Sequence, residues 1–249
     1  MTSNRFYIKQ TKPLSATVLL YGDEHHHLSK VARIKPKEKV WLFDDHGTNY
    51  LARVEEIEKD RTRLSFLEEK GKEEAKTTIT LAQALIKSKK MDFILQKATE
   101  LGITTFIPVI TARSIVKIEK KIEPKLERWQ KICQEATKQC GRSIIPSILP
   151  PQHLGKLVEE RNEERKLFLS EKRGNYLKHI LLQDSGLPQK DKQPHSVIVL
   201  TGPEGGWTAE EESLILEHNY EAVSLGKYIL KSETAAISSL AMISHFWNS

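Results

Sequence analysis

Short apolar segments separated by polar turns dominate residues 1–70. The tetrapeptide Asp44-Asp45-His46-Gly47, between two of these segments, is typical of a hairpin turn. A short helix is predicted at residues 24–31. Many short strands with closely spaced turn signals predict a small β-barrel. The strands are expected at residues 6–8, 17–21, 39–43, 49–56 and 61–67.

From Thr77 onward, strand-like and helix-like segments alternate along the chain. This alternation predicts an α/β domain in which helices cover both faces of a parallel sheet, as in a Rossmann-like fold. The charged residues 70–74 are expected to form a linker before it, and residues 183–194 an exposed loop. The strands are expected at residues 79–86, 103–110, 166–169, 196–201 and 222–225. The helices are expected at residues 91–101, 124–140, 175–183, 209–218 and 234–246.

Residues 201–206, Thr-Gly-Pro-Glu-Gly-Gly, form the most informative segment and follow the apolar run 197–200. Glycine lacks a Cβ atom, so the main chain can adopt positive φ and a ligand can approach it closely. In α/β proteins, ligands bind beyond the carboxyl ends of strands. The segment has neither the Lys-Ser/Thr pair of a P-loop nor the spacing of the Rossmann fingerprint. It predicts a small-molecule site, the alternative being a glycine-rich turn without a ligand.

A second segment, residues 223–236, reads Val-Ser-Leu-Gly-Lys-Tyr-Ile-Leu-Lys-Ser-Glu-Thr-Ala-Ala. Together the two segments resemble the C-terminal signature of the SPOUT class of RNA methyltransferases. More narrowly, they resemble the RsmE-type family, which methylates uracil N3 in 16S ribosomal RNA. The resemblance covers nearly the whole chain in order, including residues 4–8, 26–35, 43–47, 85–103, 111–116 and 134–146.

The resemblance implies a trefoil-knotted, parallel-sheet SPOUT domain at residues 73–249 that forms homodimers, preceded by a PUA-like β-barrel at residues 1–72. The knot rests on the resemblance alone, because periodicity gives no sign of it. The implied cofactor is S-adenosyl-L-methionine, held between the two loops by main-chain groups and an apolar wall. For Ile229 and Leu230 the alternative is core packing. The expected cofactor-binding residues are Thr201, Gly202, Pro203, Glu204, Gly205, Gly206, Leu225, Gly226, Ile229, Leu230 and Thr234.

Uracil N3 must lose its proton before it can attack a methyl group, so a base or an anion-stabilising cation is expected. Arg142 and Arg113 are the leading candidates, because both follow the ends of predicted elements. Glu233, in the first turn of the last helix, is the third. The alternatives are a solvated charge or phosphate contact for each arginine, and a helix-dipole role for Glu233. Glu135 and Gln139, on the helix before Arg142, are placed to orient it or to contact the base.

Lys and Arg total 39 against 33 for Asp and Glu, a net charge of +6 that fits a polyanionic partner such as ribosomal RNA or the small ribosomal subunit. For each lysine alone, a solvated face is the alternative. Lys231 stands where the resembling family usually has arginine; it keeps the charge but loses the planar fork. The expected RNA-binding residues are Arg5, Lys30, Arg33, Lys35 and Gln139, joined by Lys87, Lys89 and Lys90.

No apolar run approaches the ~20 residues of a membrane helix, and the N-terminus lacks the apolar core of a signal peptide. We therefore expect a cytoplasmic protein with no membrane partner. Cys133 and Cys140 lie on one predicted helix, roughly 10 Å apart, which is too far for a disulfide. No metal is expected, since His25, His26 and His27 have no cysteine partners and cannot converge on one ion.

Two other functions stay open beside uracil-N3 methylation of 16S ribosomal RNA. The first is a SPOUT methyltransferase that acts on another RNA, such as a transfer-RNA ribose. The second is a non-catalytic RNA-binding or ribosome-assembly factor that keeps the cofactor fold. Cofactor titration distinguishes the second from the enzymes, and analysis of modified nucleosides distinguishes the two enzymes from each other.

Overall fold

The computed structural model describes residues 4–9, 16–114, 122–184 and 193–248. Residues 115–116 of the motif at 111–116 and residues 185–192 of the predicted loop lie outside the described residues. The chain divides into two compact units. The first contains residues Met1–Glu74 and Gln134–Ile145, and the second contains Ala75–Cys133 and Pro146–Ser249. Residues 134–145 thus belong to the first unit although they follow the start of the second along the chain.

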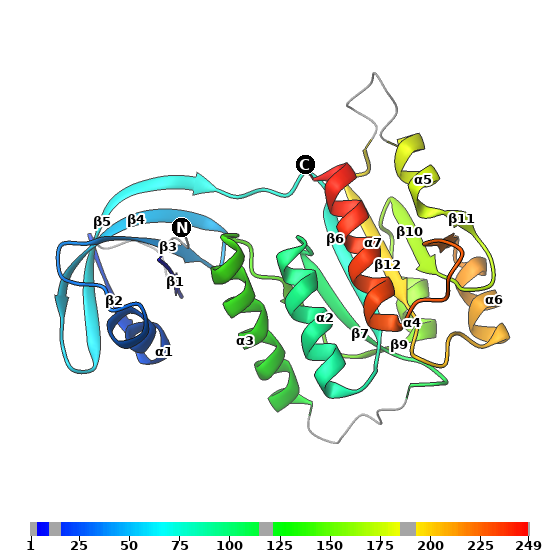
Figure 1. Cartoon of the computed structure of the whole chain (residues 1–249), viewed down its shortest axis with the longest axis horizontal. Helices are drawn as coiled ribbons and strands as arrows, with labels where there is room; N and C mark the ends of the chain where they lie inside the picture. Colours follow the sequence, from blue (N-terminus) through cyan, green and yellow to red (C-terminus); the bar gives the residue numbers. More distant parts are fainter. Residues whose placement is uncertain (1–3, 10–15, 115–121, 185–192, 249) are drawn as a thin grey trace. The chain divides into compact units, whose positions relative to one another are not determined.

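The first unit is built on a five-stranded sheet in the order β1-β3-β4-β5-β2 (Figure 1). The strands β3, β4, β5 and β2 pair in antiparallel fashion, whereas β1 runs parallel to β3. Phe6, Leu28, Leu42, Val54 and Leu64 are fully buried in its core. The elements are β1 (Arg5–Ile8), β2 (Thr17–Tyr21), α1 (Gly22–His26), the π-helix η1 (His27–Val31), β3 (Lys39–Asp44), β4 (Thr48–Ile57) and β5 (Arg61–Lys72).

The predicted hairpin at residues 44–47 is confirmed. Gly47 has a φ of 77°, a value that favours glycine. The Asp44 carboxylate accepts hydrogen bonds of 2.9 Å from the backbone N–H groups of both His46 and Thr48. This arrangement fixes the turn through the side chain of its first residue.

The predicted linker at residues 70–74 is wrong for its first three residues. Strand β5 continues through Lys72, where it pairs with Thr48 of β4. The Lys70 and Lys72 side chains are exposed, so a solvated strand accommodates these charges. The two strands continue together past the apolar part of the sequence because each supplies the other's backbone hydrogen bonds.

Within the first unit, a buried ion pair joins residues 134–140, the last turns of α3 (Glu123–Cys140), to α1. The Glu24 carboxylate accepts hydrogen bonds from Lys138 Nζ at 2.9 Å, from Gln134 Nε2 at 2.9 Å and from the Tyr7 N–H at 3.2 Å. Burial disfavours the charge on Lys138, but the Glu135 and Glu24 carboxylates outweigh burial and raise its pKa. One carboxylate on α1 thereby connects β1 with Gln134 and Lys138 of the same unit.

The second unit is a parallel sheet with eight strands among the described residues, in the order β11-β13-β10-β12-β6-β7-β8, with β9 also on β7. All of its described strand pairs are parallel, as the alternating pattern predicted. The strands are β6 (Thr78–Ala84), β7 (Thr105–Ile110), β8 (Ser147–Ile148), β9 (Gln152–His153), β10 (Arg165–Leu169), β11 (Asn175–Tyr176), β12 (Ser196–Thr201) and β13 (Glu221–Ser224).

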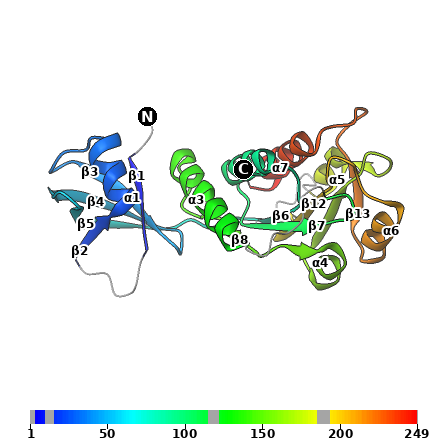
Figure 2. The same ribbon diagram turned by 90° about the horizontal axis from the view of Figure 1, so that it is seen from below.

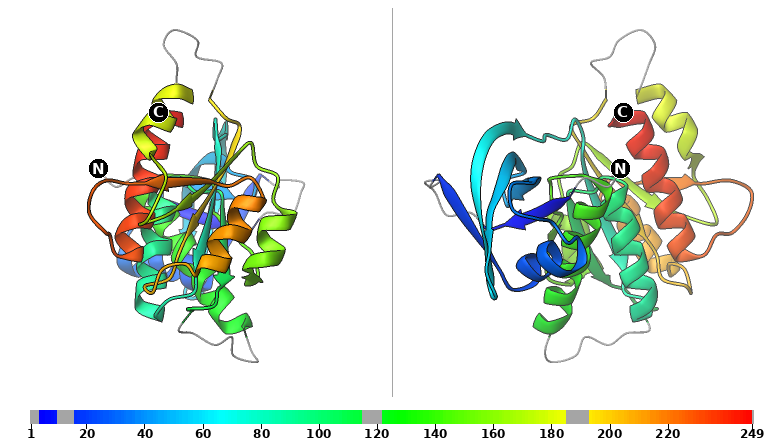
Figure 3. Two further views of the ribbon diagram at one scale, coloured as in Figure 1. Left: turned by 90° about the vertical axis from the view of Figure 1, so that its right-hand side faces the viewer. Right: turned by 60° about the vertical axis from the view of Figure 1, so that its left-hand side comes forward.

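Helices cover both faces of this sheet (Figures 2 and 3). On one face α7 packs against α2 and α5, and on the other α4 packs against α6. Ile198, Leu200 and Phe168 are fully buried in the centre, because strands covered on both faces have no polar side. The helices are α2 (Ser88–Glu100), α4 (Leu154–Glu160), α5 (Leu177–Asp184), α6 (Ala209–Glu217) and α7 (Ser232–Trp247).

Short elements account for the differences from the predicted order. The strands β8, β9 and β11 have two residues each, and α4 has seven. None was predicted, because segments this short do not show a periodic pattern of apolar residues. The helix predicted at residues 175–183 starts as β11 and becomes helical at Leu177.

Candidate functional site

The glycine-rich loop follows β12 at the carboxyl edge of the parallel sheet. Gly206 has a φ of 69°, and a Cβ atom there would lie 3.2 Å from Glu171 Oε1. A Cβ atom on Gly202 would lie 3.1 Å from the Trp207 ring. The loop ends at Thr208, whose side chain and that of Glu211 form a capping box at the start of α6. Glycine is therefore favoured at Gly206 by conformation and at Gly202 by close packing.

The second predicted loop follows β13 and leads into α7. Gly226 has a φ of 148° with no atom within 4 Å of an added Cβ, so conformation alone favours glycine there. Tyr228 and Ile229 are 72% and 75% exposed, which is unusual for large apolar side chains. The alternative reading of Ile229 as a core residue is therefore wrong. Leu230 is 37% exposed and Thr234 is also exposed.

A cleft of about 310 Å³ lies between these loops. The strands β10, β12 and β13 are neighbours in the sheet, and the cleft lies at their carboxyl ends. Of the residues predicted to bind a cofactor, all line the cleft except Gly205 and Thr234. Those that line it are Thr201, Gly202, Pro203, Glu204, Gly206, Leu225, Gly226, Ile229 and Leu230.

Sequence reasoning missed part of the cleft wall. Ser170 and Glu171 follow β10, and their proximity depends on β10 lying between β12 and β13. The predicted strand at 166–169 was the available signal, because parallel strands bring their carboxyl ends to one edge. The missed lining residues are Leu169, Ser170, Glu171, Trp207, Glu212, Val223, Ser224, Lys227, Tyr228, Lys231, Ser232 and Ala235.

Hydrogen bonds fasten the cleft walls to one another. Ser232 Oγ, at the start of α7, donates to the Gly202 carbonyl at 2.6 Å and accepts from Gln83 Nε2 at 3.0 Å. Trp207 Nε1 donates to the Leu169 carbonyl at 2.9 Å. Thr201 Oγ1 is buried and has no hydrogen-bond partner among the described residues. Because such atoms are costly without a partner, Thr201 is suited to bind a ligand group in the cleft.

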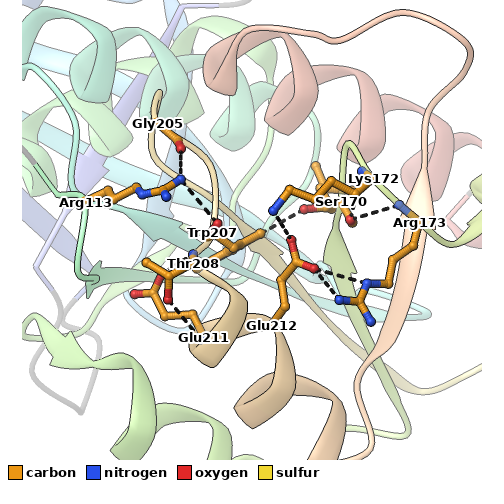
Figure 4. Close-up of polar contacts among 10 residues, drawn as sticks. Arg113, Ser170, Lys172, Arg173, Gly205, Trp207, Thr208, Glu211 and Glu212 are labelled. Carbon is orange, nitrogen blue, oxygen red and sulfur yellow. Dashed lines mark hydrogen bonds and ion pairs between the residues drawn. The ribbon is translucent and has the colours of Figure 1, made fainter.

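Figure 4 shows Arg113, which follows β7, in contact with the glycine-rich loop, and Glu211 in contact with Thr208. Arg113 Nη1 donates to the Gly205 carbonyl at 2.6 Å and lies 3.4 Å from the Trp207 carbonyl. The Glu211 carboxylate accepts the Ala112 N–H at 2.7 Å and the Thr208 N–H at 3.0 Å. Arg113 thus contacts the outside of the loop and does not line the cleft.

A second group in Figure 4 neutralises a buried carboxylate at the cleft wall. Glu212, with a side chain only 3% exposed, pairs with Lys172 at 3.3 Å and Arg173 at 2.6 Å. Ser170 Oγ accepts hydrogen bonds from the backbone N–H groups of both cations. This network connects the turn after β10 to α6.

Glu233 lies in the first turn of α7 and pairs with Lys90 at 3.3 Å. Lys90 Nζ also lies 3.1 Å from Glu204 Oε1 of the glycine-rich loop. Glu233 does not line the cleft. Its catalytic assignment stays a prediction, and its observed contact is with a cation that also holds the loop.

Arg142 belongs to the first unit, where its Nε lies 3.7 Å from Glu73 Oε1 and its side chain is 14% exposed. Its carbonyl oxygen accepts a hydrogen bond from Arg5 Nη2 at 3.2 Å. Gln139 and Glu135 are exposed on the preceding helix, and Glu135 pairs with Lys138. The role of Arg142 in catalysis stays a prediction.

The predicted RNA-binding residues of the first unit differ in exposure. Lys30, Arg33 and Lys35 are exposed around the end of η1. Arg5 is instead engaged by Asn49 Oδ1 and by Ser143 Oγ, each at 2.7 Å, and burial lowers its pKa. Arg5 therefore has a structural role within this unit, and its predicted phosphate contact is not tested.

The cysteines and histidines form no metal site within the described ranges. Cys133 is buried and Cys140 exposed, and both are free thiols. His25 is buried against Thr62, with His25 Nδ1 at 2.8 Å from Thr62 Oγ1. In the part of the chain that the structure describes, no helix is both long and apolar enough to span a membrane.

Comparison with known proteins agrees with this architecture. Residues 73–244 match the family model for an RNA methyltransferase domain, and residues 20–67 match that for an RNA methyltransferase PUA domain. Ribosomal RNA small subunit methyltransferase E of Bacillus subtilis is 30% identical over 97% of this chain and 96% of its own. The Aquifex aeolicus protein of that name is 33% identical over 92% and 94%.

Solved structures extend the similarity to three dimensions. The Neisseria gonorrhoeae ribosomal RNA small subunit methyltransferase E, bound to S-adenosyl methionine, aligns with a TM-score of 0.85 and 34% identity over 98% of both chains. A Legionella pneumophila structure with bound SAM aligns with a TM-score of 0.86 and 30% identity over 98% of this chain and 97% of its own. Both the sequence and the fold thus match over nearly the full length. The chain therefore belongs to the ribosomal RNA small subunit methyltransferase E family.

Proposed function

We propose that this protein transfers a methyl group from S-adenosyl-L-methionine to uracil N3 of small-subunit 16S ribosomal RNA. The carrying observation is the cleft between the glycine-rich loop and residues 225–230, at the carboxyl edge of the parallel sheet of a chain in this family. Relatives named for ribosomal RNA methylation, and one such relative crystallised with the cofactor, support the reaction class.

The residues of the cleft fit the cofactor. The cleft has a volume of about 310 Å³, which suits a small molecule. Leu225, Ile229 and Leu230 offer an apolar wall for the adenine ring, and the exposed state of Ile229 leaves it free to pack on a ligand. Thr201 Oγ1 is a buried polar atom without a partner among the described residues. Both kinds of group are therefore present for an amphipathic ligand.

When bound, S-adenosyl-L-methionine supplies an activated methyl group on its sulfonium. The protein's residues then need only align the base, manage charge and exclude water. Uracil N3 would first lose its proton, and we assign stabilisation of the resulting uracil anion to Arg142. The N3 lone pair would then form the bond to the methyl carbon while the carbon–sulfur bond breaks and leaves the demethylated, neutral thioether. Arg113 and Glu233 are the other candidates for charge management around the base. The alternative for all three is the structural contact described above.

We further propose that residues 1–72 form the RNA-binding domain and residues 73–249 the knotted methyltransferase domain, and that the protein acts as a homodimer. The exposed apolar side chains Tyr228 and Ile229 support a partner that covers them. Light scattering on the full chain is expected to give twice the 28.5 kDa chain mass. A stable monomer at micromolar concentration would contradict the dimer without affecting the cofactor site.

The decisive experiment compares nucleosides from a deletion strain and a complemented strain by mass analysis. N3-methyluridine in 16S ribosomal RNA should disappear on deletion and return on complementation. Loss of a ribose methylation in transfer RNA instead would favour the first alternative. Unchanged modification together with no calorimetric binding of S-adenosyl-L-methionine would favour a non-catalytic assembly factor.

Lys231 stands where the resembling family usually has arginine. Cofactor binding by main-chain groups does not depend on that side chain.

A further inference from the structure

The two walls of the cleft come from separate segments and have a common contact in Lys90. Lys90 lies in the first turn of α2. Its Nζ atom lies 3.1 Å from Glu204 Oε1 in the glycine-rich loop and 3.3 Å from Glu233 Oε1 at the start of α7. The Lys90, Glu204 and Glu233 side chains are only 33%, 24% and 18% exposed. One partly buried ammonium group therefore bridges the glycine-rich loop and the first turn of α7, which directly follows the 225–231 loop.

The positive charge of Lys90 offsets the repulsion between the Glu204 and Glu233 carboxylates. Two carboxylates that share one cation repel each other once the cation is removed, and partial burial limits the screening of that repulsion. The hydrogen bond with Glu204 raises the pKa of Lys90, as expected for an ammonium group held by carboxylates. Removal of Lys90 is expected to separate Glu204 from Glu233 and with them the two loops.

A second connection between the same segments lies beside the first. Ser232 Oγ, one residue before Glu233, donates to the Gly202 carbonyl at 2.6 Å. Glu204 is two residues after Gly202, so both loops are joined at adjacent points. The Ser232 hydrogen bond links neutral groups, whereas the Lys90 bridge links three charges. Lys90 therefore supplies the electrostatic part of the connection.

We infer that Lys90 is a positioning residue that holds the glycine-rich loop and the 225–231 loop in the geometry that binds the cofactor. This assigns Lys90 a role different from the phosphate contact predicted from sequence. Because the Lys90 ammonium group already contacts two carboxylates, we do not expect it to bind an RNA phosphate. The identity of the ligand rests on the proposed function, but the bridge itself does not.

Steady-state kinetics with Lys90→Met test this role, with Lys156→Met as the control because Lys156 forms a surface ion pair with Glu160 on α4 and its side chain is 64% exposed. Lys90→Met should raise KM for S-adenosyl-L-methionine about tenfold. The kcat should change little, because a saturating concentration of cofactor holds the two loops in their binding geometry. Lys90→Arg should recover most of the affinity because it restores the positive charge between both carboxylates. Lys156→Met should leave this KM unchanged. An unchanged KM in a folded Lys90→Met protein would overturn the inference.

A binding experiment tests the repulsion directly. By calorimetry, Lys90→Met/Glu233→Gln should bind S-adenosyl-L-methionine more tightly than Lys90→Met, because one repelling carboxylate is gone. Equal affinities for these two variants would overturn the electrostatic argument. A loss of RNA affinity in Lys90→Met that matches Lys89→Met, with unchanged cofactor affinity, would assign Lys90 to RNA instead. Failure of the wild-type protein to bind the cofactor would refute the proposed function, which separates the two failures.

Discussion

The Arg113 guanidinium donates a 2.6 Å hydrogen bond to the carbonyl oxygen of Gly205. Arg113 follows β7 and Gly205 follows β12, so the contact joins the ends of two strands separated in the sheet by β6. A Cβ atom on Gly205 would lie 3.3 Å from Arg113 Cδ. Gly205 thus faces the arginine and does not line the cleft, which changes the reason for a glycine at this position.

Replacing Arg113 by alanine should weaken cofactor binding. A hydrogen bond from a charged group contributes about 1.5–3 kcal/mol, and the exposure of Arg113 favours the lower end. We expect calorimetry to show a Kd for S-adenosyl-L-methionine about tenfold higher. Arg128→Ala, which changes an arginine 61% exposed on α3, is the control. Normal cofactor affinity with lost turnover would show instead that Arg113 acts on the RNA substrate.

The glycines of the loop should differ in their tolerance of alanine. Gly206 has a φ of 69°, which costs an L-residue about 1–2 kcal/mol, and its Cβ would also press on Glu171. Gly205→Ala needs only a few tenths of an ångström of movement by the flexible Arg113 side chain. Urea unfolding should therefore show a larger loss of stability for Gly206→Ala than for Gly205→Ala. The reverse order would contradict the conformational argument.

Arg142→Ala should lower the single-turnover methylation rate about a hundredfold, a typical cost of losing a preorganised electrostatic group. Cofactor affinity should change little, because an interaction that strengthens in the transition state acts on turnover. Arg142→Lys should recover only part of the rate. The control is Glu73→Gln, which removes the ion-pair partner of Arg142 and leaves the guanidinium. If both variants lose stability equally and keep full turnover, the role of Arg142 is structural.

Lys30→Gln, Arg33→Gln and Lys35→Gln should each weaken RNA binding, because these exposed side chains are available to phosphates. Each change should reduce the slope of log affinity against log salt by roughly 0.7 for single-stranded RNA. Lys59→Gln, in the turn between β4 and β5, is the exposed control. Filter binding across a salt series measures the slopes. Slopes identical to the wild-type value in all three variants would exclude this surface as the phosphate site.

Lys138→Met should destabilise the protein by about 3 kcal/mol, because it leaves Glu24 buried without its cation. The value is at the lower end for a buried pair, since Gln134 and Tyr7 still donate to Glu24. The pKa of Lys138 is raised, so its stabilisation is complete below the unfolded pKa of about 10.4. It is lost only as pH rises through the folded value, and urea unfolding at pH 7 should detect all of it.

The control for this pair is Glu135→Gln, which removes the 65% exposed partner of Lys138. A surface ion pair of this kind contributes about 0–1 kcal/mol, so its unfolding midpoint should stay close to that of the wild-type protein. Equal losses in the two variants would show that the buried carboxylate does not depend on Lys138.

The sequence by itself determined the order of the long elements, the parallel α/β class of the second unit and the glycine-rich loop after β12. These features depend on local properties, namely apolar periodicity, the hairpin and cap residues, and the conformational freedom of glycine. The same local signals placed Gly202, Gly206 and Gly226 on loops that line the cleft. The resemblance to a known family added the cofactor and the RNA substrate, which periodicity could not supply.

Only the tertiary structure decided which side chains meet. The order β13-β10-β12-β6 brings Ser170 and Glu171 to the glycine-rich loop, although some 30 residues separate them along the chain. Arg5 binds the interior of its own unit, and Lys90 bridges Glu204 and Glu233, although both had the sequence signature of phosphate-binding cations. Sequence specifies the charge of a side chain, but its partner is decided by strand order and by the direction in which packing holds it.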